Sequence, residues 1–380
     1  MKVAIDCRSL RKSSSGIPNF LVTAINEMAG QEPGWSFYLL TNEPFNAELE
    51  NNLHKFQNVH VIVRPLPIFR SVSSLWYLLK AGQVVREVKA DLFWGPAFLL
   101  PPGLPRHMKK LVTVHDMVYK VFPSTMSFGN KLFFRLLHDY SIRSADMIWT
   151  NSAYTQQSLE QFFPEWRPER VYTGFFINTD IFRPLELQET EVRSLKQKYA
   201  ITDKTILFVG TLEPRKNLSF LLSLMPTLVS KGYRLLIIGA KGWGSHQTGT
   251  DPALLEQLAD SVRFGGFVPT EELVKIYNMA ALYLSTSKNE GFGMPQLEAM
   301  ACGCPVISPH NSAMIEVVEG VGETVKGWGK DDWLKTIERV NQNRAMYAQA
   351  GLERVKQYNK RAVVASMLAY VKNGMMPARI

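Results

Sequence analysis

The stretch ILFVGTLEPRKN, from Ile206 to Asn217, combines an apolar run, a glycine and a proline in the order typical of a buried strand followed by a helix. Pro214 is placed to open that helix, because proline is favoured in a first helical turn. Ligands bind open α/β sheets at the carboxyl ends of the strands, where Arg215 and Lys216 fall. Cations in a first helical turn are repelled by the positive end of the helix dipole, and a bound anion would offset this repulsion. A diphosphate fits this position, and a solvated basic pair is the alternative.

Strand and helix patterns alternate over the rest of the chain. Apolar, β-branched runs predict strands at Val3–Cys7, Phe37–Leu40, His60–Val63, Leu111–His115, Met147–Thr150, Thr205–Gly210, Arg234–Gly239, Val262–Val268, Leu282–Ser285 and Val306–Ser308. Apolar residues spaced by three or four predict helices at Phe20–Met28, Ser74–Glu87, Lys131–Ser144, Ala153–Phe163, Leu218–Val229, Glu271–Ala280, Pro295–Ala301, Trp333–Asn341, Ala345–Gln357 and Arg361–Val371. This alternation predicts an α/β fold of two doubly wound, Rossmann-like lobes that face a cleft, with helices at the C-terminus.

The alternation fails between Asn178 and Lys204, where the chain is polar and rich in glutamate. We therefore predict an N-terminal lobe over residues 1–180 and a C-terminal lobe over residues 181–355. Residues 356–380 are predicted to form a helix that could cross back to the first lobe.

Composition excludes several classes of protein. With 46% hydrophobic and 20% charged residues in 380, the chain is too apolar to be disordered. Its net charge of +9 favours acidic partners. Three cysteines are too few for a disulfide framework or a four-ligand zinc site, so we expect them to be buried in a reducing compartment. The sequence begins MKVAIDCRS and contains no apolar stretch of about 18 residues, so we expect neither a signal peptide nor a membrane span.

Two loops at predicted strand ends have the residues expected of a phosphate or sugar site. Asp6–Pro18 contains Gly16 ahead of a helix, where the missing side chain would let an anion approach, although a plain flexible loop is the alternative. NEGFGMPQLE, from Asn289 to Glu298, places a glycine-flanked loop before a helix that Pro295 begins. The amides of this loop are predicted to point into the cleft. Glu290 and Glu298 on either side of it could accept hydrogen bonds from a polyol such as ribose or hexose.

The strand LVTV is followed directly by His115 and Asp116, again at a carboxyl edge. A lone histidine is more often structural. At this position we expect His115 to be functional, because imidazole can bond a sugar hydroxyl or lie beside developing charge. Asp116 is its predicted companion.

Taken together, these motifs resemble those of the family-4 retaining glycosyltransferases, whose two-lobed fold is called GT-B. The resemblance covers most of the chain. It rests on GTLEPRKN at Gly210–Asn217, VRFGGFV at Val262–Val268, EGFGMPQLEAMACGCPVI at Glu290–Ile307 and SAMIEVV at Ser312–Val318. DCRSL, SGIPNF and VTVHD in the first half look most like the mannosyltransferase-like branch that builds bacterial surface polysaccharides.

The resemblance implies that a nucleotide-diphospho-sugar binds mainly to the C-terminal lobe and that the acceptor enters from the N-terminal lobe. The residues that it implicates in donor binding are Gly16, Gly210, Arg215, Lys216, Phe267, Val268, Glu290, Gly291, Phe292, Gly293, Met294 and Glu298. Arg215 and Lys216 would hold the diphosphate, Glu298 the ribose, and Glu290 with the loop amides the hexose. His115, Glu290, Arg215 and Lys216 would be the catalytic residues, with Asp116 on the acceptor side.

The family keeps the anomeric configuration by a front-side attack in which an oxygen of the leaving phosphate takes the acceptor's proton. This implies that no nucleophile and base pair is needed and that stabilisation of the departing diphosphate dominates catalysis. Enzymes of this fold generally work without a bound metal, so we expect no cofactor. The chain departs from the family in having Ser15-Gly16 where two glycines are common, and Tyr358-Asn-Lys360 where an aromatic pattern usually ends in tryptophan.

From Asn51 to Lys120 ten basic residues stand against three acidic ones, interleaved with apolar residues that include Phe69, Trp76 and Tyr77. Such a surface suits the inner face of an anionic membrane and a lipid-linked acceptor, although aromatic core residues beside solvated charges are the alternative. Nucleic acid is disfavoured because no reading motif accompanies the charge.

The sequence therefore predicts a cytoplasmic, peripheral-membrane enzyme that transfers a hexose to a lipid-linked saccharide, with mannose from GDP-mannose as the expected donor. A UDP-sugar donor (GlcNAc, GalNAc or glucose) and a non-catalytic nucleotide-sugar-binding protein are the alternatives. A nicotinamide-dependent oxidoreductase is disfavoured, because neither lobe carries Gly-x-Gly-x-x-Gly after its first strand.

Overall fold

The structure is a computed structural model that describes residues 1–11, 16–53, 56–66, 72–122, 128–166, 170–240 and 252–375, without side chains over 128–134. The chain divides into two compact units. Unit 1 comprises Met1–Phe176 and Asn359–Ile380, and unit 2 comprises Ile177–Tyr358.

Unit 1 is built on a parallel sheet of seven strands in the order β3-β2-β1-β4-β5-β6-β7. The strands are β1 (Lys2–Asp6), β2 (Ser36–Thr41), β3 (Val59–Val63), β4 (Leu92–Gly95), β5 (Lys109–Val114), β6 (Met147–Thr150) and β7 (Val171–Thr173). The order reverses direction between β1 and β4, which makes the carboxyl ends of these strands a topological switch point.

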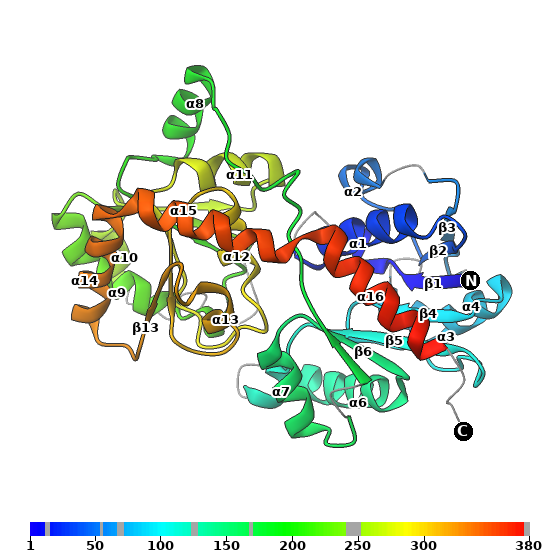
Figure 1. Cartoon of the computed structure of the whole chain (residues 1–380). Coiled ribbons are helices and arrows are strands. Elements are labelled where there is room, and N and C mark those ends of the chain that lie inside the picture. The colour runs from blue at the N-terminus through cyan, green and yellow to red at the C-terminus, as the bar shows by residue number, and fades with distance from the viewer. Residues whose placement is uncertain are drawn as a thin grey trace. The chain divides into compact units, whose positions relative to one another are not determined.

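Helices cover both faces of this sheet (Figure 1). They are α1 (Ile17–Gln31), α2 (Ala47–Asn52), α3 (Ser73–Leu79), α4 (Ala81–Val88), α5 (Val118–Val121), α6 (Phe128–Ser144), α7 (Ala153–Phe162) and the C-terminal α16 (Lys360–Met375). Figure 1 shows α1 and α2 on one side of the sheet and α6 and α7 on the other.

The C-terminal helix α16 belongs to unit 1 and packs against α1. Lys360 pairs with Glu27 at 3.5 Å, and the hydroxyl of Tyr172 donates to the carbonyl of Val363 at 2.8 Å. The last helix is therefore fixed to both the first helix and the last strand of the unit.

Unit 2 has a parallel sheet of six strands in the order β10-β9-β8-β11-β12-β13. The strands are β8 (Thr205–Val209), β9 (Arg234–Ile238), β10 (Val262–Gly266), β11 (Leu282–Leu284), β12 (Val306–Pro309) and β13 (Glu323–Val325). The switch point of this sheet lies between β8 and β11. The fold is thus the predicted pair of Rossmann-like sheets.

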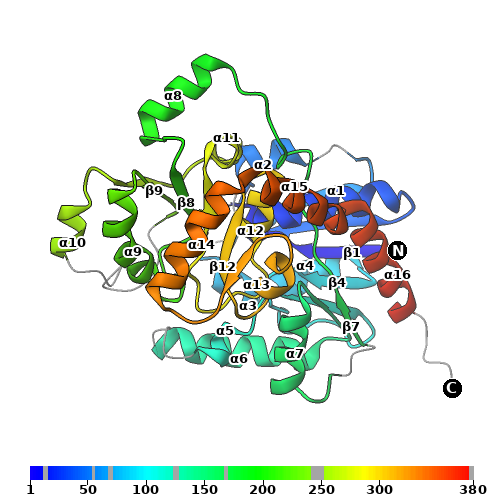
Figure 2. The ribbon, with the colours of Figure 1, turned by 60° about the vertical axis from the view of Figure 1, so that its left-hand side comes forward.

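The helices of unit 2 surround its sheet, as Figure 2 shows for α9, α12 and α14. They are α8 (Glu189–Tyr199), α9 (Leu218–Ser230), α10 (Pro252–Gln257), α11 (Thr270–Met279), α12 (Met294–Ala301), α13 (Met314–Val318), α14 (Lys330–Gln342) and α15 (Arg344–Val355). Trp333 on α14 is fully buried against the core of α9 and the sheet, and its indole stacks on Trp328 at 5.7 Å.

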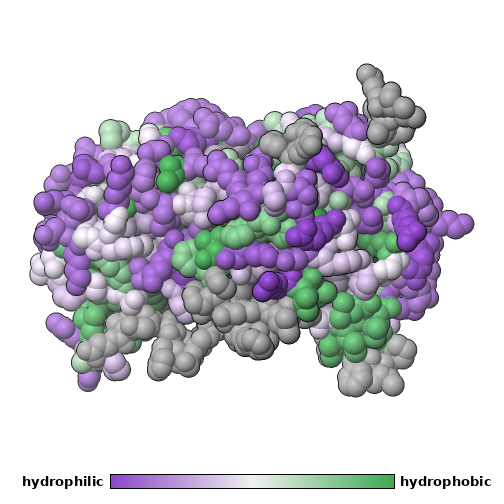
Figure 3. All heavy atoms as spheres, turned by 90° about the horizontal axis from the view of Figure 1, so that it is seen from below, coloured by the Kyte–Doolittle hydropathy of each residue, from purple (hydrophilic) through white to green (hydrophobic). Residues whose placement is uncertain are grey.

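The surface departs from the predictions at two aromatic residues. Trp76 and Tyr77 are only 1% and 2% exposed, so they belong to the core of unit 1 and not to a membrane-facing surface. Phe69 and its neighbours Pro67 and Ile68 lie outside the described residues. Figure 3 shows one face on which hydrophobic residues gather beside such undescribed segments. The described helices include none that is long and apolar enough to cross a membrane. All three cysteines are buried, as predicted, and they are unpaired.

Candidate functional site

Arg215 and Lys216 lie in a short 3-10 turn, Pro214–Lys216, and not in the first turn of an α-helix as predicted. Asn217 follows in the left-handed conformation, with a φ of 52°, and only then does α9 begin. Residues that follow β11, on the other side of the switch point, hold this turn. The Thr286 hydroxyl donates to the carbonyl of Lys216 at 2.9 Å, and the Lys288 amide donates to the carbonyl of Arg215 at 2.8 Å. The two cations are thereby fixed at the carboxyl end of β8.

The carboxylate of Glu290 joins both cations. Nη1 of Arg215 lies 2.7 Å from its Oε2, and Nζ of Lys216 lies 2.5 Å from its Oε1. The three side chains are between 11% and 15% exposed. The predicted sugar-binding acid therefore neutralises part of the predicted diphosphate site.

Electrostatics keep this acid ionised. Burial raises the pKa of Glu290, but the charges of Lys216 and Arg215 and the hydrogen bonds of Lys216 and Ser287 outweigh burial and lower the pKa to about 2. A depressed folded-state pKa contributes stability above the ordinary pKa, and this contribution is lost as the pH falls towards about 2. Glu213 also pairs with Arg215, whose Nη2 lies 3.4 Å from its Oε2. The triad of Arg215, Lys216 and Glu290 thus has a second carboxylate beside it, which balances the remaining positive charge.

Gly210 leaves room for Lys216. A Cβ at Gly210 would lie 3.2 Å from Cε and 3.4 Å from Nζ of that lysine, tighter than ordinary contact. The glycine at the end of β8 therefore lets the ammonium group lie over the end of the strand.

The glycine-flanked loop leads into α12 as predicted, with Pro295 in its first turn. Gly293 caps the helix with a φ of 105°, and a Cβ there would lie 3.2 Å from the amide carbon of Gln296, so glycine is required for both conformation and space. Phe292 is 5% exposed and packs edge-on against Tyr358 at 5.6 Å. Gly291 is buried and Met294 is half-buried, so this loop offers a ligand chiefly its main chain.

Glu298 lies within α12 and is 8% exposed. The hydroxyl of Tyr277, on α11, donates to its Oε2 at 3.0 Å, and this is the only hydrogen bond to the Glu298 carboxylate in the described part of the chain. Burial raises the pKa of Glu298 to about 7, and the Tyr277 hydrogen bond opposes that shift. Glu298 therefore titrates near neutrality, in contrast to Glu290.

We expect Glu298→Gln to stabilise the ligand-free protein above about pH 7 and to weaken nucleotide binding there. A raised carboxyl pKa costs stability progressively as the pH rises from the ordinary value of 4.5 to about 7, and glutamine removes that cost. Thermal melts of both proteins at about pH 5 and about pH 8 would check this, with coincident melting at the lower pH as the internal control. Equal melting temperatures at the higher pH would contradict the assignment.

Phe267 and Val268 follow β10 directly, at the same carboxyl edge of the sheet. Val268 is 4% exposed and Phe267 is 48% exposed. The structure thus brings Gly210, Arg215, Lys216 and Glu290 into one cluster and sets the α12 loop, Glu298 and the β10 end along the same edge.

In unit 1, His115 follows β5 and is 9% exposed. Its Nε2 lies 2.7 Å from the carbonyl oxygen of Pro96, and burial lowers its pKa to about 4. The side chain of Asp116 accepts from the Val118 amide at 3.0 Å at the start of α5, so it is engaged in a local turn. Gly16 caps α1 with a φ of 47° and has nothing within 4 Å of the position of a Cβ.

Sequence reasoning missed two residues of the site. Tyr277 is the partner of Glu298. Ser312, with a φ of 48°, accepts from the Glu290 amide at 3.0 Å and donates to Oδ1 of Asn311 at 2.9 Å. Ser312 stood within a motif that the resemblance used, so its proximity to Glu290 could have been suspected. No pattern in the sequence pairs Tyr277 with Glu298.

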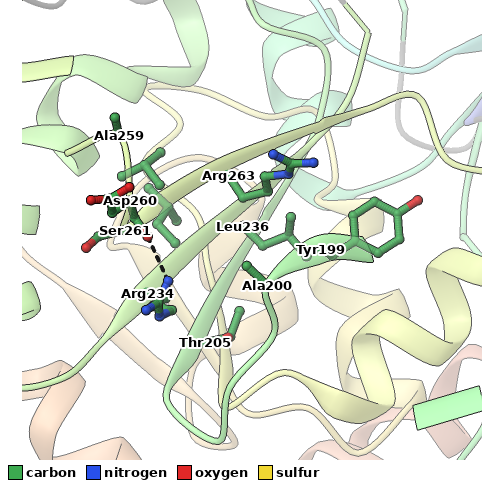
Figure 4. Close-up of a pocket in the computed structure, with 11 residues that line it drawn as sticks. Tyr199, Ala200, Thr205, Arg234, Leu236, Ala259, Asp260, Ser261 and Arg263 are labelled. Atoms are coloured by element: carbon green, nitrogen blue, oxygen red, sulfur yellow. Dashed lines mark hydrogen bonds between the residues drawn. The ribbon is translucent and has the colours of Figure 1, made fainter. Parts of the chain in front are cut away.

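One hollow in unit 2 lies at the opposite edge of the sheet. A cavity of about 200 Å³ is lined at the amino ends of β8, β9 and β10 by residues that include Thr205, Arg234 and Arg263. Figure 4 shows Tyr199 and Arg263 near one another and Arg234 beside Ser261. None of the predicted donor-binding residues lines it. Among the residues that the structure describes, no cluster of three or more His, Cys, Asp or Glu side chains could hold a metal ion.

Comparison with known proteins decides the family. The model of "Glycosyltransferase Family 4" matches residues 15–177, and that of "Glycosyl transferases group 1" matches residues 191–358. Together they cover most of the chain, one in each unit. The chain belongs to the family-4 glycosyltransferases. The resemblance inferred from the motifs is confirmed.

Relatives of this glycosyltransferase include the O-antigen chain mannosyltransferase B of Escherichia coli, which is 29% identical over 271 residues, 68% of either protein. The D-inositol 3-phosphate glycosyltransferase of Mycolicibacterium smegmatis is 33% identical over 182 residues, which are 46% of this chain and 42% of that protein. The chain thus matches less than half of that relative.

Solved structures confirm the GT-B fold. Anabaena HepE in complex with UDP-glucose is similar over 98% of this chain and all of its own, with a TM-score of 0.73 at 16% identity. WaaG, a glycosyltransferase involved in lipopolysaccharide biosynthesis, is similar over 97% of this chain and 98% of its own, with a TM-score of 0.70 at 15% identity.

Proposed function

We propose that this glycosyltransferase transfers a hexose, with retention of configuration, from a nucleotide-diphospho-sugar to a lipid-linked saccharide in the synthesis of a cell-surface polysaccharide such as O-antigen or exopolysaccharide. The observation that carries the proposal is the triad of Arg215, Lys216 and Glu290 at the carboxyl edge of the unit 2 sheet. A buried lysine and a largely buried arginine on one fixed turn are suited to a diphosphate, because charge-assisted hydrogen bonds to phosphate are strong where water is excluded.

The donor is proposed to be GDP-mannose, since the E. coli relative is named as an O-antigen chain mannosyltransferase. Glu298 would accept from the ribose hydroxyls, and the main chain near Phe267 and Val268 would meet the base. Glu290 and the amides of Gly291–Gly293 would hold the hexose. A UDP-sugar is the second candidate, because Anabaena HepE was solved with UDP-glucose.

The reaction requires only groups of the substrates and this triad. The acceptor oxygen bonds to the anomeric carbon on the face from which the diphosphate departs, the bond from that carbon to the phosphate oxygen breaks, and a phosphate oxygen takes the acceptor's proton. Arg215 and Lys216 stabilise the negative charge that develops on the diphosphate, which is the main catalytic contribution of the protein. We propose that this step needs no bound metal.

Unit 1 is proposed to bind the acceptor. Asp116 and His115 lie after β5 at the carboxyl edge of its sheet, the edge at which α/β proteins bind ligands. Gly16, at the amino end of α1, is proposed to approach the donor diphosphate.

The nucleotide base is tested by thermal melts with GDP, UDP, ADP and dTDP, each with and without EDTA. We expect GDP to raise the melting temperature most and EDTA to change nothing, because a ligand that binds only the folded state stabilises it. A larger shift with UDP would select the second donor. The absence of any shift would contradict donor binding, and loss of the shift in EDTA would contradict metal independence.

A lipid-linked acceptor implies that the protein binds at an anionic membrane surface. Val72, Leu78 and Leu79 are 40%, 37% and 66% exposed in unit 1, and Leu79 adjoins Lys80. Apolar side chains beside cations favour the headgroup region of anionic bilayers. We expect co-sedimentation with phosphatidylglycerol vesicles that Leu79→Glu weakens and that Met346→Glu, at an exposed position in unit 2, leaves unchanged. Equal binding by both variants would contradict this surface.

A further inference from the structure

The segment Gly95–Leu100, which begins at the last residue of β4, contacts the imidazole of His115 in two ways. The carbonyl oxygen of Pro96 lies 2.7 Å from Nε2. The ring of Phe98 lies edge-on to the imidazole, at 5.4 Å and an interplanar angle of 71°. Neither Pro96 nor Phe98 was expected from the sequence to belong to a site.

This loop is conformationally constrained. Phe98 has a φ of 68°, which a bulky side chain rarely adopts and which persists only where its surroundings enforce it. Its amide donates to the carbonyl of Thr113 on β5 at 3.1 Å, and the Tyr77 hydroxyl donates to that of Leu99 at 2.6 Å. A Cβ at Gly95 would lie 2.0 Å from the carbonyl oxygen of Leu99, so the tight bend requires glycine. The strained backbone therefore holds the Phe98 ring at a fixed place.

The rings of Phe98 and His115 each meet a further aromatic ring. The His138 ring stacks on the Phe98 ring at 4.9 Å, nearly parallel to it at 3°. Phe20 on α1 meets the His115 ring edge-on at 5.5 Å. Burial lowers the pKa of His115 to about 4, and the hydrogen bond to the Pro96 carbonyl opposes this shift. The imidazole is therefore uncharged at neutral pH.

The hydrogen-bond partner decides the tautomer. A carbonyl oxygen can only accept, so Nε2 carries the single proton of the neutral ring and Nδ1 carries a lone pair. In the described part of the chain, Nδ1 makes no hydrogen bond. Saccharides offer several hydroxyl groups that can donate to such an acceptor.

We propose that Pro96 and Phe98 are positioning residues that hold His115 as the Nε2–H tautomer and so present Nδ1 as an acceptor for a hydroxyl of the saccharide substrate. This inference rests on the proposed function and deepens it. It assigns His115 the role of a neutral hydrogen-bond acceptor. It excludes the roles of a proton donor through Nδ1 and of a cation that pairs with a phosphate, because the neutral Nε2–H ring has neither a proton on Nδ1 nor a positive charge.

Two substitutions of His115 distinguish the roles of its two ring nitrogen atoms. The amide oxygen of asparagine lies close to the position of Nδ1, whereas the amide nitrogen of glutamine reaches towards that of Nε2. We expect His115→Gln to lower kcat/KM for transfer by about tenfold or more and His115→Asn to lower it less, because only asparagine keeps the acceptor. Both should bind GDP as the wild type does, since GDP carries no sugar. If kcat/KM fell equally in the two variants, or fell further in His115→Asn, the proposed role of Nδ1 as an acceptor would be overturned.

The positioning role has a readout that does not depend on activity. In ¹⁵N NMR spectra of histidine-labelled full-length protein, we expect His115, assigned with the His115→Gln variant, to show a protonated Nε2 and an unprotonated Nδ1 from about pH 6 to about pH 8. Phe98→Tyr should keep this pattern and the transfer rate. Phe98→Gly relieves the backbone strain but removes the ring, so we expect mixed tautomers and slower transfer.

Lys89→Gly is the matched control, because Lys89 also has a positive φ, 51°, at the end of α4. An unchanged spectrum and unchanged transfer in Phe98→Gly would overturn the positioning role. If the wild type bound no nucleotide diphosphate, the proposed function would fail, while the spectra would still decide whether the loop fixes the tautomer.

Discussion

Replacing Lys216 with alanine is expected to lower kcat/KM for hexose transfer by about a hundredfold to a thousandfold, the usual cost of removing one preorganised donor to developing negative charge. Lys216 is 9% exposed and its ammonium group is fixed over Gly210 at the end of β8. Most of the loss should appear in kcat, because the charge on the diphosphate increases as the glycosidic bond breaks.

The matched control is Lys204→Ala, which removes the same charge at the other end of the same unit. Lys204 is exposed and its Nζ donates to the carbonyl of Lys231 at 2.9 Å. We expect this variant to transfer hexose at the wild-type rate. If Lys216→Ala were folded by thermal melting and differed no more from wild type than Lys204→Ala, the diphosphate assignment would be wrong.

Replacing Glu290 with glutamine is expected to separate nucleotide binding from transfer. The Glu290 carboxylate pairs with both cations, so a diphosphate bound by them would share them with a negative charge. Juxtaposed like charges in an interface cost several kcal/mol, and removal of one should tighten GDP binding. Transfer should fall by about a hundredfold, because the group proposed to hold the hexose is neutral.

Calorimetric titration of GDP and a transfer assay on the same preparation would measure both effects. Glutamine keeps an oxygen for hydrogen bonding, so we expect the free energy of unfolding to fall by only about 1–3 kcal/mol. Glu319→Gln, at a glutamate whose side chain is 60% exposed, is the control and should change neither quantity. Weaker GDP binding together with full transfer would reverse the proposed roles.

Much of the fold could be predicted because strands that are buried on both faces leave continuous apolar runs. β6 was predicted with its observed bounds, Met147–Thr150. β4, with the sequence LFWG, was missed because prolines and glycines follow it closely. β13 was missed because only one of its three residues, Val325, is buried and apolar, so it leaves no apolar run. α8 escaped prediction because its surface is charged and only Leu195 and Tyr199 are buried.

The helix predicted at Ser74–Glu87 is two helices, α3 and α4, that meet at Lys80. Apolar periodicity continues across the junction, so it did not mark the break. Likewise, the proline at Pro214 begins a 3-10 turn, and the left-handed Asn217 separates this turn from α9.

The candidate site was predictable where its residues are close in sequence to a glycine loop or a strand end. Glu290 and Glu298 were found in this way. The Tyr277 hydroxyl and the Pro96 carbonyl were not, because each reaches its partner only through the packing of one element on another. The direct pairing of Glu290 with Arg215 and Lys216 also depends on tertiary structure, since about 75 residues separate them.

The most direct test of the account is a transfer assay in EDTA with GDP-mannose and lipid-linked saccharide, followed by NMR analysis of the anomeric configuration of the product. We expect transfer with the α configuration of the donor retained, at a rate that Lys216→Ala reduces about a hundredfold or more. Transfer with inversion would contradict the front-side mechanism. If the folded, GDP-binding protein transferred no sugar from any nucleotide donor to such acceptors, the proposed function would be wrong.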